Sequence, residues 1–180
     1  KSNNTLAFNE SEAKSIDVIK TVNKSTFIKE VTSNFSPHKE DIYVDFDYEG
    51  LIIKKLSQEG PAFAVGDLNN DGRDDVFIGG AKNQAGAIYL QRGNNGFEKI
   101  TQNSIIDDAL FEDTAATFID VDQDGDLDLI VASGGNNSED SKNYNNRLYL
   151  NNGKGMFTDK ILLPSTNNNV SVIAPFDFNY

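Results

Sequence analysis

Two acidic stretches of the chain place oxygen-bearing side chains at alternate positions, which is the arrangement of a loop that wraps a hard cation. The first reads DLNNDGRDD from Asp67 to Asp75, and the second reads DVDQDGDLD from Asp120 to Asp128. Each has side-chain oxygens at positions one, three, five and nine, and a glycine at position six that allows a sharp turn. Ca²⁺ prefers a shell of oxygen ligands, so we expect each loop to bind one ion. The expected ligands are Asp67, Asn69, Asp71, Arg73 and Asp75 in the first loop and Asp120, Asp122, Asp124, Asp126 and Asp128 in the second, with Arg73 and Asp126 offering backbone carbonyls.

The flanks of these loops predict strands rather than the helices of an EF-hand. An EF-hand loop carries a bidentate Glu at position twelve, where this chain has Ile78 and Val131. Short apolar runs enter and leave both loops, so each loop is expected to close a β-hairpin. The alternative is a pair of acidic turns without metal, since Asp and Asn are common in turns. Carboxylates crowded around one turn repel one another, and this repulsion favours the calcium interpretation. A structural role for the ion is favoured over a regulatory one.

The similarity between the two halves of the chain extends beyond the acidic loops. The loops lie 53 residues apart, whereas Tyr89 and Phe97 align with Tyr149 and Phe157 at an offset of 60. The extra residues fall in the polar stretch 136–146, which we expect to be a surface loop. Each unit reads as four antiparallel strands, the plan of a propeller blade. The expected strands are 62–65, 76–80, 87–91 and 97–100 in the first unit and 117–119, 129–135, 147–151 and 156–160 in the second.

We therefore predict an all-β fold, a partial β-propeller with two complete four-stranded antiparallel blades, the start of a third, and an irregular N-terminal segment. The expected divisions are 1–60, 61–113, 114–169 and 170–180. Strand-like runs also occur at 26–31, 42–46, 51–56 and 170–176, and a weak helical period at 12–22. A third calcium loop begins at Asp177 and Asn179 and is cut short at Tyr180. Because propellers close with about four to eight blades, we expect the chain to be a piece of a longer protein.

The composition narrows the class of protein and its partners. The 180 residues carry a formal net charge of −12 and no cysteine, which excludes disulfides and thiolate metal sites. An acidic chain with no basic stripe argues against nucleic acid as a partner. No apolar run approaches the roughly 18 residues of a membrane span, so membrane insertion is not expected. Calcium loops of extracellular modules bind at about 0.1 to 1 mM, which favours an extracellular, cell-surface or periplasmic location.

The loops and the hairpins that follow them resemble the FG-GAP/VCBS repeat family, whose calcium-loop repeats build β-propellers. The segments GDLNNDGRDDVFIGG, IDVDQDGDLDLIVASGG and RLYLNNGKGMF carry this resemblance. The run from His38 to Asp67 is also similar to the opening of ASPIC-type VCBS proteins of Bacteroidetes. Two departures are the presence of only two complete units and Asn69, where many copies have Asp. The resemblance implies a calcium-stabilised propeller at the cell surface or in the periplasm, and no single activity.

Two hypotheses for function remain open from the sequence. The favoured one is a non-enzymatic module of a secreted or surface protein, structural or ligand-binding, with a glycan or protein ligand contacted by loops such as 136–146. The alternative is the propeller portion of a polysaccharide-degrading enzyme whose catalytic residues lie elsewhere. Exposed blade edges are a further risk, because unpaired strand backbone promotes self-association.

Other residues that could do chemistry have simpler explanations. His38 could pair with Glu40 or Asp41 in a catalytic arrangement, but a surface or packing role is favoured for a lone histidine. Carboxylates at 45, 47 and 49 could act in glycoside hydrolysis, yet their alternation with apolar residues predicts the solvated face of a strand. Tyr144, in the inserted loop, is the best single candidate for ligand contact. Core packing is favoured over sugar stacking for Phe63, Phe77, Tyr89, Phe97, Phe118, Tyr149 and Phe157.

Overall fold

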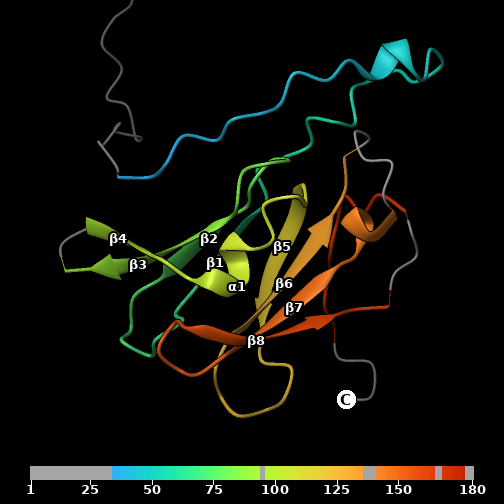
Figure 1. Cartoon of the computed structure of the whole chain (residues 1–180). Helices are drawn as coiled ribbons and strands as arrows, with labels where there is room; N and C mark the ends of the chain where they lie inside the picture. The colour runs from blue at the N-terminus through green and yellow to red at the C-terminus, as the bar shows by residue number, and fades with distance from the viewer. Residues whose placement is uncertain (1–33, 94–95, 136–140, 165–167, 177–180) are drawn as a thin grey trace, which may run out of the picture. The chain divides into compact units, whose positions relative to one another are not determined.

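The computed structural model describes residues 34–93, 96–135, 141–164 and 168–176. They form two four-stranded antiparallel sheets with very little helix, which confirms the all-β prediction and its division into two blades (Figure 1). In both sheets the strands follow one another in chain order, which is a meander topology. Among the described residues, no helix has the length and apolar character that crossing a bilayer requires.

The first sheet follows the order β1-β2-β3-β4. Its strands are β1 (Phe63–Gly66), β2 (Asp75–Ile78), β3 (Ala87–Arg92) and β4 (Gly96–Ile100). The pairing of Phe77 with Ile88 and of Val76 with Tyr89 places alternate side chains on opposite faces. Phe77 and Ile88 enter the main core, whereas Val76 and Tyr89 form a second cluster against which Phe35 packs. Both faces of β2 and β3 are therefore covered, which explains their nearly continuous apolar sequence.

The second sheet repeats this plan after a short connection that contains α1 (Asn103–Ile106). Its strands are β5 (Asp113–Ile119), β6 (Asp128–Ser133), β7 (Arg147–Asn151) and β8 (Phe157–Leu162). The longer connection between β6 and β7 ends in the single-turn helix η3 (Ser141–Tyr144). The sheets meet through β1 and β5, where a Cβ at Gly66 would lie 2.8 Å from Leu127 and 3.4 Å from Phe118.

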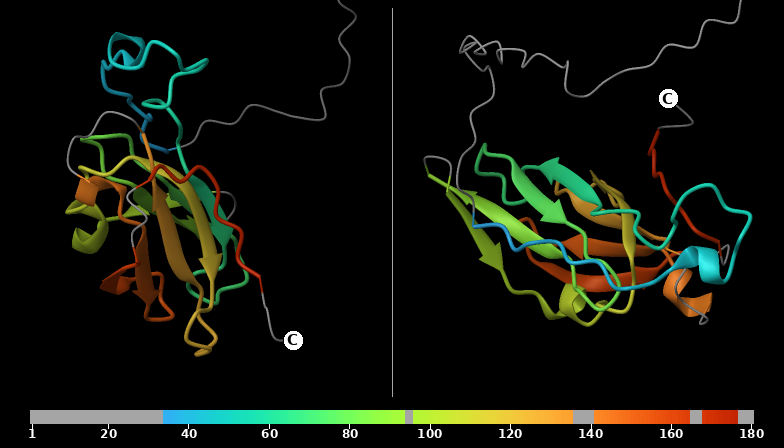
Figure 2. Two further views of the ribbon diagram at one scale, coloured as in Figure 1. Left: turned by 90° about the vertical axis from the view of Figure 1, so that its right-hand side faces the viewer. Right: turned by 90° about the horizontal axis from the view of Figure 1, so that it is seen from above.

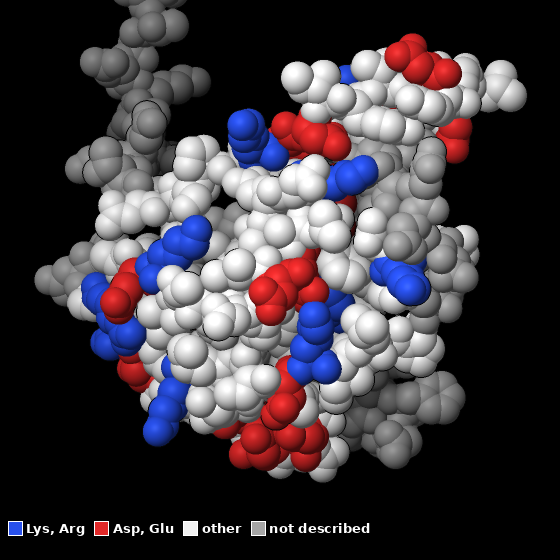
Figure 3. All heavy atoms as spheres, in the orientation of Figure 1, with Lys and Arg blue, Asp and Glu red and all other residues white. Residues whose placement is uncertain are grey.

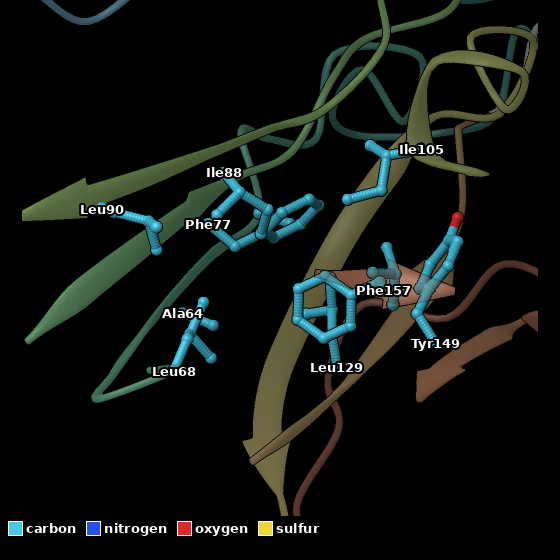
Figure 4. Close-up of a cluster of buried hydrophobic side chains, with 11 residues drawn as sticks. Ala64, Leu68, Phe77, Ile88, Leu90, Ile105, Leu129, Tyr149 and Phe157 are labelled. Carbon is cyan, nitrogen blue, oxygen red and sulfur yellow. The ribbon is translucent and has the colours of Figure 1, made fainter. Parts of the chain in front are cut away.

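The main core lies between the two sheets. Figure 4 shows Phe77, Ile88 and Leu90 of the first sheet on one side and Leu129, Tyr149 and Phe157 of the second on the other. Ile105 of α1 joins this cluster, so the connection between the blades is itself packed. Tyr149 and Phe157 lie edge to face, with ring centroids 6.5 Å apart. The core therefore contains residues of both repeats, and neither blade buries it alone.

The prediction of strands at 42–46, 51–56 and 170–176 was wrong. Asp45 to Asp47 form a single-turn helix, η2, because the Asp45 carboxylate accepts the backbone N–H groups of Leu56 and Ser57 and closes the segment into a loop. Residues 170–176 are irregular: Val170 donates one backbone hydrogen bond to Ser133, and no ladder follows in the described part of the segment. The expected strand at 26–31 and the helical period at 12–22 lie outside the described residues.

Candidate metal loops

The first loop (residues 67–75) is the turn of the β1–β2 hairpin. Asp67 accepts backbone N–H groups through both carboxylate oxygens, from Asp71 at 3.1 Å and from Gly72 at 2.7 Å. Asn69 accepts a second hydrogen bond from the Asp71 N–H at 3.1 Å. The turn requires positive φ at Asn70 (56°) and Gly72 (80°), a backbone conformation that asparagine and glycine adopt readily. The side chains at positions one and three are thus drawn toward the inside of the loop.

The second loop (residues 120–128) has the same conformation in the β5–β6 hairpin. Asp120 accepts the Gly125 N–H at 3.1 Å, and Asp122 accepts the Asp124 N–H at 3.3 Å. Positive φ recurs at positions four and six, at Gln123 (63°) and Gly125 (95°). Acidic side chains gather at this end of the molecule, over the β5–β6 hairpin at the bottom of the view (Figure 3). Figures 1 and 2 place the 45–56 loop at the opposite end of the sheets.

Three carboxylates of the second loop converge on one point. Oxygens of Asp120, Asp122 and Asp124 all lie within 4.8 Å of one another. Ca²⁺ binds oxygens at about 2.3–2.6 Å, so two ligands on opposite sides of one ion are about 5 Å apart or less. The Oδ1 atom of Asp120 is buried and has no hydrogen-bond partner among the described residues. Burial, followed by the neighbouring charge of Asp124, raises the pKa of Asp122. This donor set fits a calcium ion.

The ninth-position carboxylates, Asp75 and Asp128, lie outside the group of converging carboxylates and accept hydrogen bonds at the base of their loops. Both are almost fully buried, and both carboxylate oxygens of each accept a backbone N–H. Asp75 accepts from Leu68 at 3.0 Å and Gln91 at 2.7 Å, and Asp128 accepts from its own loop and from Asn151 at 2.9 Å. Burial raises the pKa of Asp75, and the hydrogen bonds from Gln91 and Leu68 oppose that rise. Each ninth-position carboxylate thereby ties its loop to the third strand of its blade.

The seventh-position residues differ between the loops. The Arg73 guanidinium pairs with the fifth-position carboxylate of Asp71, with Nη2 2.8 Å from Oδ2. The corresponding residue of the second loop is Asp126, whose Oδ1 accepts a hydrogen bond from Asn70 at 2.9 Å. A cation entering the first loop therefore competes with Arg73 for Asp71, whereas the second loop holds no such internal cation. The third predicted loop, at Asp177 and Asn179, lies outside the described residues.

A buried polar network at the junction of the blades was missed by the sequence reasoning. Arg147 is 1% exposed and donates from Nη2 to Asp113 Oδ1 at 2.5 Å and to Ser133 Oγ at 3.1 Å. Its guanidinium also lies 4.2 Å from the centroid of the Phe111 ring. Asp113 in turn accepts the backbone N–H of Gly80 in the first blade at 2.9 Å. The network links the second blade to the first through buried polar contacts, which indicates a structural role.

Of the residues considered for acid–base chemistry, His38 and Glu40 form a contact and Asp45 has a structural role. His38 Nε2 lies 2.7 Å from Glu40 Oε1, as the sequence allowed. Asp47 and Glu49 are exposed as predicted, but the segment is not a strand, and Asp45 is fully buried with its carboxylate accepting the Ser57 N–H and hydroxyl. Burial raises the pKa of Asp45, but the hydrogen bonds of Ser57 and Leu56 outweigh it and lower the pKa overall. Asp45 therefore holds the 45–56 loop in shape.

The recurring aromatic residues are mostly part of the core. Four of the seven have exposures of 4% or less, namely Phe77, Tyr89, Tyr149 and Phe157. Phe97 and Phe118 pack against the core clusters while partly buried. Phe63 differs, since it is 56% exposed on β1. Tyr144 lies half-buried in η3, at the end of a loop that is only partly described.

Tandem four-stranded antiparallel sheets, each with an acidic hairpin between its first two strands, define a blade-repeat protein. Residues 67–131 and 120–180 each match the family described as FG-GAP-like repeat. Together these matches cover more than half of the chain, so the chain belongs to the FG-GAP-like repeat family, as the sequence resemblance indicated. Such repeats are typical of extracellular proteins and often bind Ca²⁺. A comparison with curated proteins finds no match.

Proposed function

We propose that the chain is a calcium-binding, non-enzymatic repeat module of an extracellular or cell-surface protein. Each of the two loops takes one Ca²⁺, which fixes the hairpin between the first two strands of its blade. The observation that carries this proposal is the convergence of Asp120, Asp122 and Asp124, with the buried Asp120 Oδ1 left without a partner among the described residues. An ion there supplies the missing partner and neutralises the repulsion between the carboxylates.

The two sites should differ in affinity. The second loop offers aspartates at positions one, three and five, whereas the first has the neutral Asn69 at position three. Arg73 further neutralises Asp71 in the first loop. Since the affinity of calcium loops rises with ligand charge and with the rigidity of the site, we expect the second loop to bind more tightly than the first.

Calorimetric titration of the chelator-stripped protein with Ca²⁺ tests the proposal, together with thermal melts of the stripped and loaded forms. We expect two sites, and loss of the tighter one in the variant Asp124→Asn. An ion present at 100 times its dissociation constant stabilises the folded state by about 2.7 kcal/mol. For a chain of this size that corresponds to a rise in Tm of about 5–10 °C. Absence of both heat and thermal shift would remove the calcium proposal.

The module is proposed to present its loops to a glycan or protein ligand. Supporting this role is the length of the β6–β7 connection, which exceeds its counterpart in the first blade and includes the half-buried Tyr144. Surface loops on a rigid scaffold are common places for recognition. Glycan-array screening of the calcium-loaded protein and of a variant with residues 136–143 shortened to the length of the first-blade loop tests this role. A glycan hit that survives the shortening would place recognition elsewhere on the module.

A further inference from the structure

The two loops are joined to each other through one buried amide, that of Asn151 at the end of β7. Its Nδ2 donates to the carbonyl of Leu68 in the first loop at 2.9 Å and to the carbonyl of Leu127 in the second loop at 3.0 Å. Its Oδ1 accepts the N–H of Asn152 at 2.8 Å, and its own N–H donates to Asp128. Asn151 is 8% exposed, and both polar atoms of its side chain and its backbone N–H have partners. The amide therefore keeps its bonds only while both loops hold their positions.

A second direct contact lies nearer to the tips of the loops. Asn70, at position four of the first loop, donates from Nδ2 to Asp126 Oδ1 in the second loop at 2.9 Å. The equivalent residue of the second loop, Gln123, has the same positive φ, but its side chain makes no hydrogen bond to any described residue. Asn70 and Gln123 therefore share a backbone conformation, but among the described residues Asn70 alone of the two makes an inter-loop hydrogen bond.

The turn between β7 and β8 lies against residues of both loops. A Cβ at Gly155 would lie 2.9 Å from Leu90 and 3.7 Å from the Cβ of Leu68, so this turn abuts the base of the first loop. At Gly153 the same atom would overlap the carboxylate of Asp126, so the turn also abuts the second loop. Gln102 fixes the turn from the inter-blade connection, donating to the Gly155 carbonyl at 2.8 Å. A displacement of either loop is thus transmitted to a packed element that contacts the other.

We propose that Asn151 and the Asn70–Asp126 contact couple the two calcium loops, so that an ion in one raises the affinity of the other. The proposal rests on the calcium binding proposed above. An ion ordering the second loop fixes Leu127 and Asp126, and with them the amide of Asn151 and the side chain of Asn70. The first loop then binds with less conformational entropy left to lose, which is positive coupling between distinct sites.

The test measures the calcium affinity of the first loop by calorimetry, with the second loop intact or disabled by Asp122→Asn with Asp124→Asn. These two substitutions remove two negative charges, the same change in charge that a bound Ca²⁺ makes. Net electrostatic attraction to the first loop is therefore matched between the loaded and the disabled second loop. We expect disabling to weaken the first site about five-fold or more, within the usual range of coupling between sites.

The same pair of titrations is then repeated with Asn151→Ala, which removes the shared amide, and with Asn70→Gly, which keeps the positive φ and lies on the surface. Gln123→Gly is the matched control, since it makes the same kind of change at the equivalent position without breaking an inter-loop bond. The coupling should fall to less than about two-fold in Asn151→Ala, decrease in Asn70→Gly and persist in the control. Circular dichroism establishes folding, and Asn70→Gly remains informative if Asn151→Ala does not fold.

The outcomes separate the two proposals. If the wild-type protein takes up no calcium, the proposed function fails and the coupling fails with it. If both sites bind but the first is unaffected by disabling the second, only the coupling is wrong. Coupling that persists unchanged in both Asn151→Ala and Asn70→Gly would overturn the assignment of these residues as its carriers.

Discussion

Glu112 is a buried carboxyl group, and its replacement by glutamine should stabilise the protein at neutral and alkaline pH. The side chain is 4% exposed, and its Oε1 accepts one N–H, from Glu59 at 3.3 Å. Its Oε2 has no hydrogen-bond partner among the described residues. Burial and, after it, the negative charges of Glu40, Asp41 and Asp45 raise the pKa of Glu112 from 4.5 to about 8. An ionised Glu112 is therefore poorly accommodated in the folded protein.

The sign and size of the effect follow from linkage between protonation and folding. Between pH 4.5 and about 8 the folded state retains the proton that the unfolded state releases. The stability associated with this proton is present below pH 4.5 and is lost as the pH rises through about 8. At 1.36 kcal/mol per pKa unit the complete loss is about 4–5 kcal/mol, of which about 3 kcal/mol has occurred at pH 7. Glutamine resembles the neutral acid and does not ionise, so Glu112→Gln should gain about 3 kcal/mol at pH 7.

Urea unfolding at saturating calcium, from about pH 5 to pH 9, measures this difference directly. We expect the two unfolding free energies to converge toward the acidic end and to separate as the pH rises. Glu98→Gln is the control, because Glu98 is exposed on β4 and forms a surface ion pair with Arg92. A gap between Glu112→Gln and the wild-type protein that stays constant with pH would refute a buried, protonated Glu112.

Three further substitutions probe the junction, the loops and the irregular segment. Arg147→Leu leaves a buried carboxylate without its cation and should lower the free energy of unfolding, measured in urea, by about 3–5 kcal/mol. Unchanged stability would contradict a structural role for the network. Gly80→Ala places a Cβ in steric overlap with the backbone carbonyl of Gln84, so the backbone must shift. The free energy of unfolding should fall by about 1–3 kcal/mol or more. Asp45→Ala releases the 45–56 loop, so limited proteolysis there should accelerate while the Tm of the blades hardly changes; a large fall in Tm would show that this loop supports the sheets.

The blades could be predicted because the sequence contains two versions of the same unit. An apolar run that is ambiguous in one copy, such as the strand entering each loop, is supported by its counterpart in the other. The acidic loops add a fixed spacing that sets where β1 ends and β2 begins. The 45–56 segment has no second copy, and its apolar residues suggested strands although Leu51 and Ile53 are fully exposed. Its conformation depends instead on the hydrogen bonds that Asp45 accepts from backbone N–H groups. The bond from Leu56 spans 11 residues, and composition does not reveal such an interaction.

The junction network was missed because it depends on the differences between the two units. Asp113, Ser133 and Arg147 come together from three strands of the second blade. At the equivalent positions of the first unit the chain has Gly60, Gly80 and Ala87. Alignment of the two units emphasises the residues that they share. The signal for the network was a difference: three polar residues of the second unit stand where the first unit has small ones. Their proximity still required the strand pairing, since 34 residues separate Asp113 from Arg147.

The two acidic loops show how one sequence pattern can have two structural roles. The carboxylates at positions one, three and five of the second loop lie near its tip and converge on one point. The ninth-position carboxylates instead accept N–H groups from their own loop and from the third strand, at Gln91 and Asn151. These hydrogen bonds hold the base of each hairpin without an ion. The proposed calcium ions would therefore order the residues of each loop and leave the strand pairing unchanged, so chelation should lower Tm through lost binding energy and leave the circular dichroism spectrum of the folded sheets in place.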